Sequence, residues 1–178
     1  AMARQMEQRL LDLLELARQG HIVRPAVPVP FADLVHEVVT ALGDRLRGGG
    51  IAVEIAPGMP AVLGDPGRLR EVLENLLDNA CKYMGGQPEP RIVIGVRAGG
   101  PKPVFFVQDN GCGIAPENLE RVFDLFCQLQ PGGSGAGAGL AIVRRIVEAT
   151  GGQVWAESAG LGKGSSICFS LPQVTGQV

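Results

Sequence analysis

Aromatic residues are scarce in this chain: they make up 4% of its 178 residues, with a single tryptophan and a single tyrosine. A core of the size that this length allows must therefore be built from Val, Ile, Leu and Ala. The formal net charge is only −2, which gives no long-range attraction to nucleic acid or to an anionic membrane. No apolar run approaches the roughly 18–20 residues of a membrane span, and the first residues of this sequence lack the apolar stretch typical of a signal peptide. We expect one soluble, cytoplasmic domain without nucleic-acid or membrane contacts.

Cysteine and histidine are also few. The cysteines are widely spaced and form no CxxC pair: Cys81, Cys112, Cys127 and Cys168. This spacing favours free thiols in a reducing cytoplasm over disulfides or a zinc site. The only histidines are His21 and His36.

The chain divides at a proline-rich stretch. Residues 2–19 carry apolar side chains at a 4-3-4 spacing, which is typical of a helix in a bundle or coiled coil. Residues 21–30 contain three prolines and favour an extended connector or an edge strand. From residue 31 the pattern is mixed. It predicts helices at 31–47, 66–84 and 139–150, a small helix at 116–126, and strands at 51–55, 91–97, 104–108, 153–157 and 165–171. We predict an α+β, two-layer sandwich in which about three helices cover one face of a mixed, mostly antiparallel sheet of about five strands.

The helix predicted at 66–84 has a polar face suited to a metal-bound phosphate. On a 3.6-residue period, Asn75, Asn79 and Lys82 gather opposite an apolar stripe. An amide oxygen is a suitable ligand for Mg²⁺, whose other positions are filled by water and phosphate. An ammonium one turn away can meet the phosphate. The alternative is an ordinary surface helix.

The strand predicted at 104–108 ends in Asp109-Asn110-Gly111. A carboxylate at the end of a buried strand can accept a hydrogen bond from the amino group of adenine, and neighbouring glycines let the backbone approach the ring. The alternative is a tight turn, because Asp-Asn-Gly is a common turn sequence. Gly113, followed by Ile114, adds more glycine than a simple turn requires.

Residues 131–139 contain five glycines and lead directly into an apolar helix. Backbone N–H groups at such a helix start form an anion site, whereas the alternative is a flexible linker. We interpret residues 116–138 as a lid anchored by Phe123 and Phe126.

These segments together resemble the catalytic, ATP-binding domain of bacterial sensor histidine kinases, part of the gyrase, chaperone, histidine kinase and mismatch-repair ATPase superfamily. Residues 75–83 resemble its N box, 109–114 its G1 box, 123–126 its F box and 135–140 its G2 box. Residues 82–85 and 125–129 are most similar to kinases with PAS or phytochrome-type sensors. The resemblance implies residues 1–20 as the end of a dimerisation and phosphoacceptor helix, 21–30 as a linker, 31–173 as the ATP-binding domain and 174–178 as a tail.

The resemblance also implies ATP and Mg²⁺ as cofactors, and it assigns roles to residues. Asn79 would bind the metal, while Asn75 and Lys82 would serve catalysis by assisting metal or phosphate. Asp109 would bind the adenine amino group. The remaining contacts to the nucleotide would come from Tyr83, Gly111, Gly113, Ile114, Phe126, Gly135, Gly137, Gly139 and Leu140. The implied partners are the dimerisation domain of the same protein and, through it, a response regulator.

Two departures from the family pattern concern the lid. Ala136 and Ala138 stand where the family usually has Thr and Leu, which removes a hydroxyl and some packing but leaves the backbone donors. After Arg121 no basic residue occurs until Arg144. Both departures predict weak nucleotide affinity.

The fate of the γ-phosphate follows from Asn75. Hydrolytic relatives place a Glu at this position to activate water, and an amide cannot act as a general base at neutral pH. We expect transfer to a histidine of another domain, because neither His21 nor His36 lies in an acceptor motif. Two alternatives remain: a stand-alone kinase or ATPase of the same fold, and a degenerate nucleotide-binding module.

Overall fold

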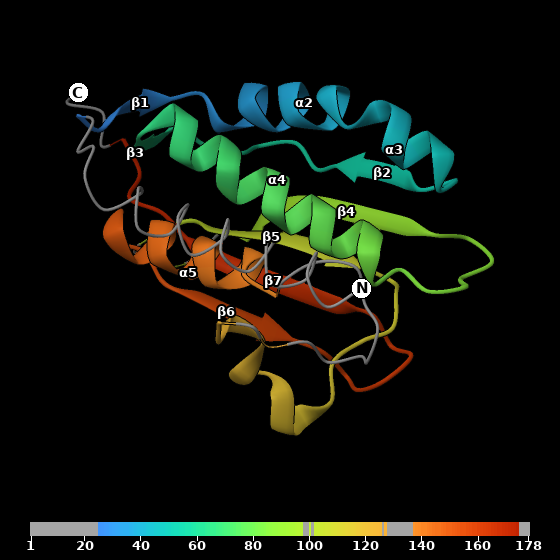
Figure 1. Cartoon of the computed structure of the whole chain (residues 1–178). Helices are drawn as coiled ribbons and strands as arrows, with labels where there is room; N and C mark the ends of the chain where they lie inside the picture. The colour runs from blue at the N-terminus through green and yellow to red at the C-terminus, as the bar shows by residue number, and fades with distance from the viewer. Residues whose placement is uncertain (1–24, 98–99, 101, 126, 128–136, 175–178) are drawn as a thin grey trace, which may run out of the picture.

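A computed structural model describes residues 25–97, 100, 102–125, 127 and 137–174 (Figure 1). The predicted N-terminal helix, Phe126 and Gly135 lie outside these residues. The described elements, in chain order, are β1 (Val27–Val29), α2 (Phe31–Ala41), α3 (Gly43–Gly48), β2 (Ala52–Ile55), β3 (Val62–Gly64), α4 (Pro66–Lys82), β4 (Arg91–Arg97), β5 (Val104–Asp109), the 3₁₀ turns η1 (Pro116–Asn118) and η2 (Arg121–Phe123), α5 (Gly139–Ala149), β6 (Val154–Glu157) and β7 (Ser165–Ser170).

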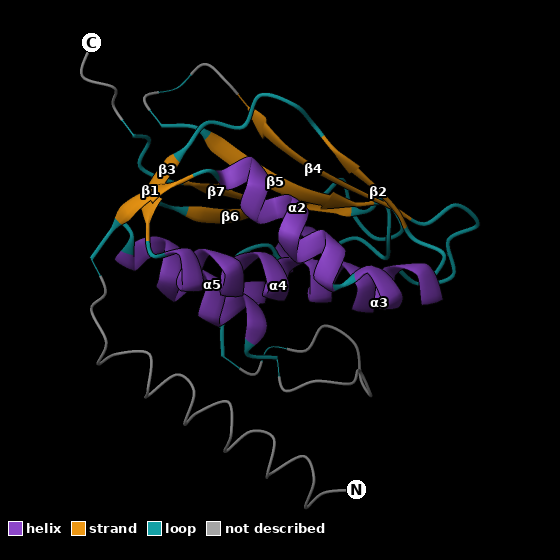
Figure 2. Cartoon of the chain, turned by 90° about the horizontal axis from the view of Figure 1, so that it is seen from above, coloured by secondary structure: helices purple, strands orange, loops and turns teal. Residues whose placement is uncertain are grey.

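A five-stranded sheet in the order β2-β4-β5-β7-β6 forms one layer. Only the β2–β4 pair is parallel; the other neighbours in this sheet are antiparallel. Helices α2, α4 and α5 lie together on one side of the sheet (Figure 2). The predicted α+β, two-layer fold is therefore confirmed.

The core lies between the sheet and the helices. The entire apolar stripe of α4 is buried: Leu69, Val72, Leu73, Leu76, Leu77 and Ala80. Three of the eight aromatic residues pack together, where Phe105 of β5 lies 4.4 Å from Phe31 and 5.7 Å from Phe169 between ring centroids. These three buried rings add large apolar surfaces to a core that is otherwise mostly aliphatic.

The start of α4 follows from local sequence. Asp65 adopts an extended backbone, and its carboxylate accepts a hydrogen bond from Gly67 N at 2.8 Å. Pro66 occupies the first helical position, where its missing N–H would be unpaired in any case. The amide-bearing face of α4 is therefore set by a capped helix with a buried stripe.

Three details differ from the sequence prediction. The helix expected at 31–47 is two helices, because the backbone leaves the helical region at Leu42 and the next residue, Gly43, favours a helix weakly. The small helix expected at 116–126 is replaced by η1 and η2. A second sheet, which we did not predict, pairs β1 with β3. Of the helices in the described ranges, none is both long and apolar enough to cross a membrane.

Candidate functional site

The polar face of α4 meets the first residue of α5. The amide nitrogen Nδ2 of Asn75 donates to the carbonyl oxygen of Glu71 at 2.8 Å, which fixes the orientation of the amide. Its Oδ1 faces Gly139, where a Cβ would lie only 3.0 Å away. A glycine at the start of α5 thus allows this close approach. The predicted metal-binding face and the predicted anion-binding helix start are therefore neighbours.

The C-terminal end of α4 carries Lys82 and Tyr83. The Nζ atom of Lys82 lies 4.9 Å from the ring centroid of Tyr83, a cation–π distance. The carbonyl oxygen of Tyr83 accepts a hydrogen bond from Cys112 N at 2.9 Å. The turn that follows β5 therefore packs against the end of α4 and holds the predicted adenine site beside the predicted phosphate ligand.

Asp109 is the last residue of β5. It is buried, with only 8% of its surface exposed. One oxygen, Oδ1, accepts from Gly111 N at 2.8 Å, and the other, Oδ2, accepts from the hydroxyl of Ser165 at 2.7 Å. Burial raises the pKa of Asp109, while these hydrogen bonds to the charged form oppose the rise. The carboxylate is thus held in a fixed orientation at the end of β5.

Two glycines of the turn after β5 stand where a side chain would collide with neighbouring backbone. A Cβ on Gly111 would lie 2.3 Å from the carbonyl oxygen of Tyr83. Gly113 has φ of 70°, and a Cβ there would lie 2.1 Å from the carbonyl oxygen of Gly160 in the β6–β7 hairpin. Ile114 is buried, and its N–H donates to Ser158 Oγ at 3.0 Å. The turn is locked between α4 and the hairpin.

The other predicted residues are placed as follows. Phe123 of η2 is buried, as expected for an anchor, and Leu140 belongs to the hydrophobic core. Gly137 lies two residues before α5 with φ of 74°. Leu140, the second residue of α5, therefore packs into the core and anchors the start of this helix.

Sequence reasoning missed two residues of the site, Ser158 and Ser165. Ser165 faces Asp109 in the β5–β7 register, and its hydroxyl holds the carboxylate. Ser158 accepts from the turn and donates to Gly164 O at 2.7 Å. Only the alignment of strands far apart in the sequence brings these hydroxyls to the turn, so no local pattern could have found them.

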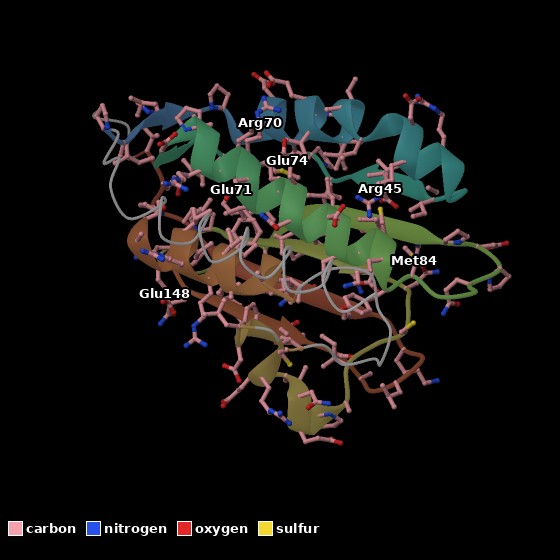
Figure 3. The ribbon with its side chains drawn as sticks, viewed as in Figure 1. Arg45, Arg70, Glu71, Glu74, Met84 and Glu148 are labelled. Atoms are coloured by element: carbon pink, nitrogen blue, oxygen red, sulfur yellow. The ribbon has the colours of Figure 1, made fainter. Side chains whose placement is uncertain are left out.

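An ion pair supports α4 from outside. The guanidinium of Arg45 on α3 pairs with the carboxylate of Asp78, the residue before Asn79. Figure 3 shows Arg45 beside the C-terminal half of α4 and Met84 just beyond its end. Met84 is buried. The C-terminal end of α4 is therefore held by the Arg45–Asp78 ion pair on its exposed side and by Met84 in the core.

The oxygen atoms available on α4 suit a metal ion that is bound together with a phosphate group. Within the described residues, no group of three or more His, Cys, Asp or Glu side chains could hold a metal ion. Asn75 and Asn79 stand one helical turn apart on α4, and their amide oxygens are neutral groups that could serve as metal ligands. Mg²⁺ takes few protein ligands and fills its shell with water and phosphate, so these residues fit Mg²⁺ bound to a nucleotide.

A buried carboxylate at a strand end, an amide-lined helix and a glycine at a facing helix start define a nucleotide-binding domain of the ATPase type. The chain belongs to the family of histidine kinase-, DNA gyrase B- and HSP90-like ATPases, whose model matches residues 64–175. It is 46% identical to the methanogenesis regulatory histidine kinase FilI of Methanothrix harundinacea (strain 6Ac) over 94% of this chain and 19% of FilI.

Solved structures of histidine kinases have the same fold as this chain. Full-length ShkA in complex with AMPPNP matches with a TM-score of 0.80 and 33% identity, over 96% of this chain and 36% of ShkA. The catalytic domain of histidine kinase ThkA matches with a TM-score of 0.71 and 27% identity, over 84% of this chain and 97% of that domain. The chain spans about a fifth of FilI. Its fold is that of a histidine kinase catalytic domain, which confirms the predicted family.

Proposed function

We propose that this domain binds ATP with Mg²⁺ and donates the γ-phosphate to a histidine on a separate dimerisation domain of the same protein, from which a response regulator receives it. The observation that carries the proposal is the meeting of three motifs around α4. Gly139 packs on Asn75, and Gly111 packs on the carbonyl of Tyr83. The likeness to ShkA in complex with AMPPNP supports a nucleotide in this place.

Each end of the nucleotide has a group of matching chemistry. The buried carboxylate of Asp109, oriented by Gly111 N and the hydroxyl of Ser165, would accept the adenine amino hydrogen. Ala138 gives the N-terminus of α5 no side-chain cap, so the N–H groups of the first turn and the positive end of the helix dipole would face phosphate. Lys82 would add its charge after leaving the ring of Tyr83.

Asn79 would hold Mg²⁺, with Asn75 assisting. When bound, the metal would neutralise part of the negative charge that develops on the transferred phosphoryl group. The hydrogen bond from Asn75 to the carbonyl of Glu71 keeps the amide oxygen toward the start of α5. The protein would thus contribute position and charge, with little proton transfer of its own.

Transfer is favoured over hydrolysis because an amide cannot remove a proton from water at neutral pH. The histidine of α2, His36, is exposed, and its backbone carbonyl accepts from the hydroxyl of Thr40 at 2.7 Å. Its helix packs by Phe31, Leu34, Val35 and Val38 into the core of this same domain. We therefore assign the acceptor histidine to another domain.

Mixing the chain with a separately made dimerisation domain and γ-labelled ATP tests the proposal. We expect acid-labile label on the acceptor domain, none on this chain alone, and little free phosphate. Asn79→Ala should remove the transfer while the fold stays intact. Release of most label as free phosphate would instead favour a hydrolase. Absence of binding heat with millimolar AMPPNP and Mg²⁺ would favour a degenerate module.

A further inference from the structure

Asn110 is the one G1-box side chain bonded to the backbone of the loop that precedes β4. It follows the last residue of β5, and its amide makes two hydrogen bonds. Its Oδ1 accepts from Arg91 N at 2.8 Å, and its Nδ2 donates to the carbonyl oxygen of Glu89 at 2.8 Å. Its own backbone N–H donates to the carbonyl oxygen of Arg91 at 3.3 Å. Three bonds thus join this residue to the start of β4.

These bonds replace one step of the β-ladder. The ladder between β4 and β5 ends with the pairing of Ile92 and Asp109. In a hydrogen-bonded antiparallel pair, two facing residues exchange both N–H···O bonds through their backbones. Between Asn110 and Arg91, one bond is of this kind, but the return bond from Arg91 N goes to the side-chain oxygen. The backbone can therefore leave the sheet at Asn110 without leaving Arg91 N unpaired.

The departure from the sheet directs the chain toward α4. The next residue, Gly111, packs on the carbonyl of Tyr83, and Cys112 N donates to the same carbonyl. The loop from Tyr83 to Arg91 is thus held at its start by Cys112 and at its end by Asn110. The same turn supplies Gly111 N to the carboxylate of Asp109. A shift at Asn110 would therefore move the turn that orients this carboxylate.

We infer that Asn110 is a positioning residue that sets the base preference of the site. By ending the ladder with its side chain, it holds Asp109 at the depth and angle needed to accept from a 6-amino purine. Its loss would relax the preference for a 6-amino over a 6-oxo purine triphosphate. The inference rests on the proposed ATP site.

Competition binding of ATP and ITP, each with Mg²⁺, tests the inference on the whole chain. ITP carries an oxygen in place of the amino group and keeps the ribose and phosphates. We expect Asn110→Ala to reduce the ATP-to-ITP affinity ratio by about three- to tenfold, since a charged hydrogen bond loses its alignment. Asn110→Ser, which keeps an oxygen able to accept from Arg91 N, should recover part of the ratio. Gln108→Ala, on the exposed side of β5, should leave it unchanged.

Equal weakening of ATP and ITP by Asn110→Ala, or a lower melting temperature with an unchanged ratio, would show a purely structural role and overturn the inference. Should Asn110→Ala fail to fold, the ratio measured for Asn110→Ser decides between the same two results. Failure of the proposed ATP site has a different signature: the unmodified chain would show no preference for ATP over ITP, and Asp109→Asn would change neither affinity.

Discussion

The proposed adenine side and the proposed phosphate side of the candidate site are built in different ways. On the adenine side, backbone packs on backbone: Gly111 lies against the carbonyl of Tyr83, and Gly113 lies against the carbonyl of Gly160. On the phosphate side, the groups are side chains on α4 and the start of α5, joined where Asn75 meets Gly139.

Because one side is built from packed backbone and the other from side chains, the two sides should contribute differently to folding stability and to ligand binding. The adenine side is held by the fold itself, so it is formed before a ligand arrives. The phosphate side is partly exposed: Asn75, Asn79 and Lys82 are all half-buried. Substitutions of the packed glycines Gly111 and Gly113 should therefore cost folding free energy, whereas substitutions on the phosphate face of α4 should cost affinity.

The largest effect is expected at Gly113. Gly113→Ala puts a Cβ at φ of 70° and 2.1 Å from the carbonyl of Gly160. We expect a loss of roughly 2–4 kcal/mol in the free energy of unfolding, from backbone strain and the forced shift of the hairpin. Urea denaturation measures this loss. Gly86→Ala is the matched control, because a Cβ there meets open space, and its stability should stay the same or rise by up to about 1 kcal/mol.

Asp109→Asn tests whether folding stability and nucleotide affinity can be changed separately on the adenine side. Because the pKa of Asp109 is raised by burial, its ionised form costs stability, and the cost disappears as pH falls through that pKa. The neutral amide should therefore leave the melting temperature unchanged or higher near pH 7, while ATP affinity falls at least about tenfold. A large loss of stability near pH 7 with unchanged ATP affinity would reverse this assignment.

Asn79→Ala tests the phosphate side. We expect affinity for AMPPNP to lose its dependence on Mg²⁺, falling to the value that the unmodified chain shows in EDTA. The free energy of unfolding should change by less than about 0.7 kcal/mol, because Ala favours a helix more than Asn does. Calorimetric titration with and without Mg²⁺ gives the affinities, and urea denaturation gives the stability. Substantial unfolding would make Asn79 a structural residue.

The smallest effect is expected on the outer sheet face, away from both sides of the site. Hydrogen bonds from Arg97, and then from Trp155, lower the pKa of Glu157 to about 2. The ordinary value is 4.5, so the stability from this pair is present above pH 4.5 and is lost as pH falls toward 2. Because both partners are about half exposed, we expect less than about 1 kcal/mol. Comparing the unmodified chain with Glu157→Gln between pH 5 and pH 3 measures the effect; parallel curves would contradict it.

The sequence predicted what short-range patterns determine. The apolar stripe with a 3.6-residue period located α4, and the opposite polar face located Asn75 and Asn79. The apolar run of β5 located Asp109 at a strand end. The sequence predicted Asp109 without any partner for its carboxylate. In the structure, the hydroxyl of Ser165, 56 residues further along the chain, donates a hydrogen bond to it.

The parts that could not be predicted depend on long-range register. Ser165 meets Asp109 only after β5 and β7 are aligned, and Asn110 meets Glu89 only after β4 and β5 are aligned. The β1–β3 pair likewise depends on register: β1 lies within the stretch predicted as a connector or edge strand, but β3 is three residues long, too short for a pattern of alternation to identify. Hydroxyls and amides at strand ends carry no periodicity of their own, so their roles emerge only from the fold.

Amide hydrogen exchange with saturating AMPPNP and Mg²⁺ tests most directly whether the two sides form one nucleotide site. We predict that protection rises together in the turn at 109–114 and in the first turn of α5, and that leaving out Mg²⁺ reduces it at both places. Protection confined to only one of these segments, or absent from both, would contradict a single ATP site between α4, the turn and α5.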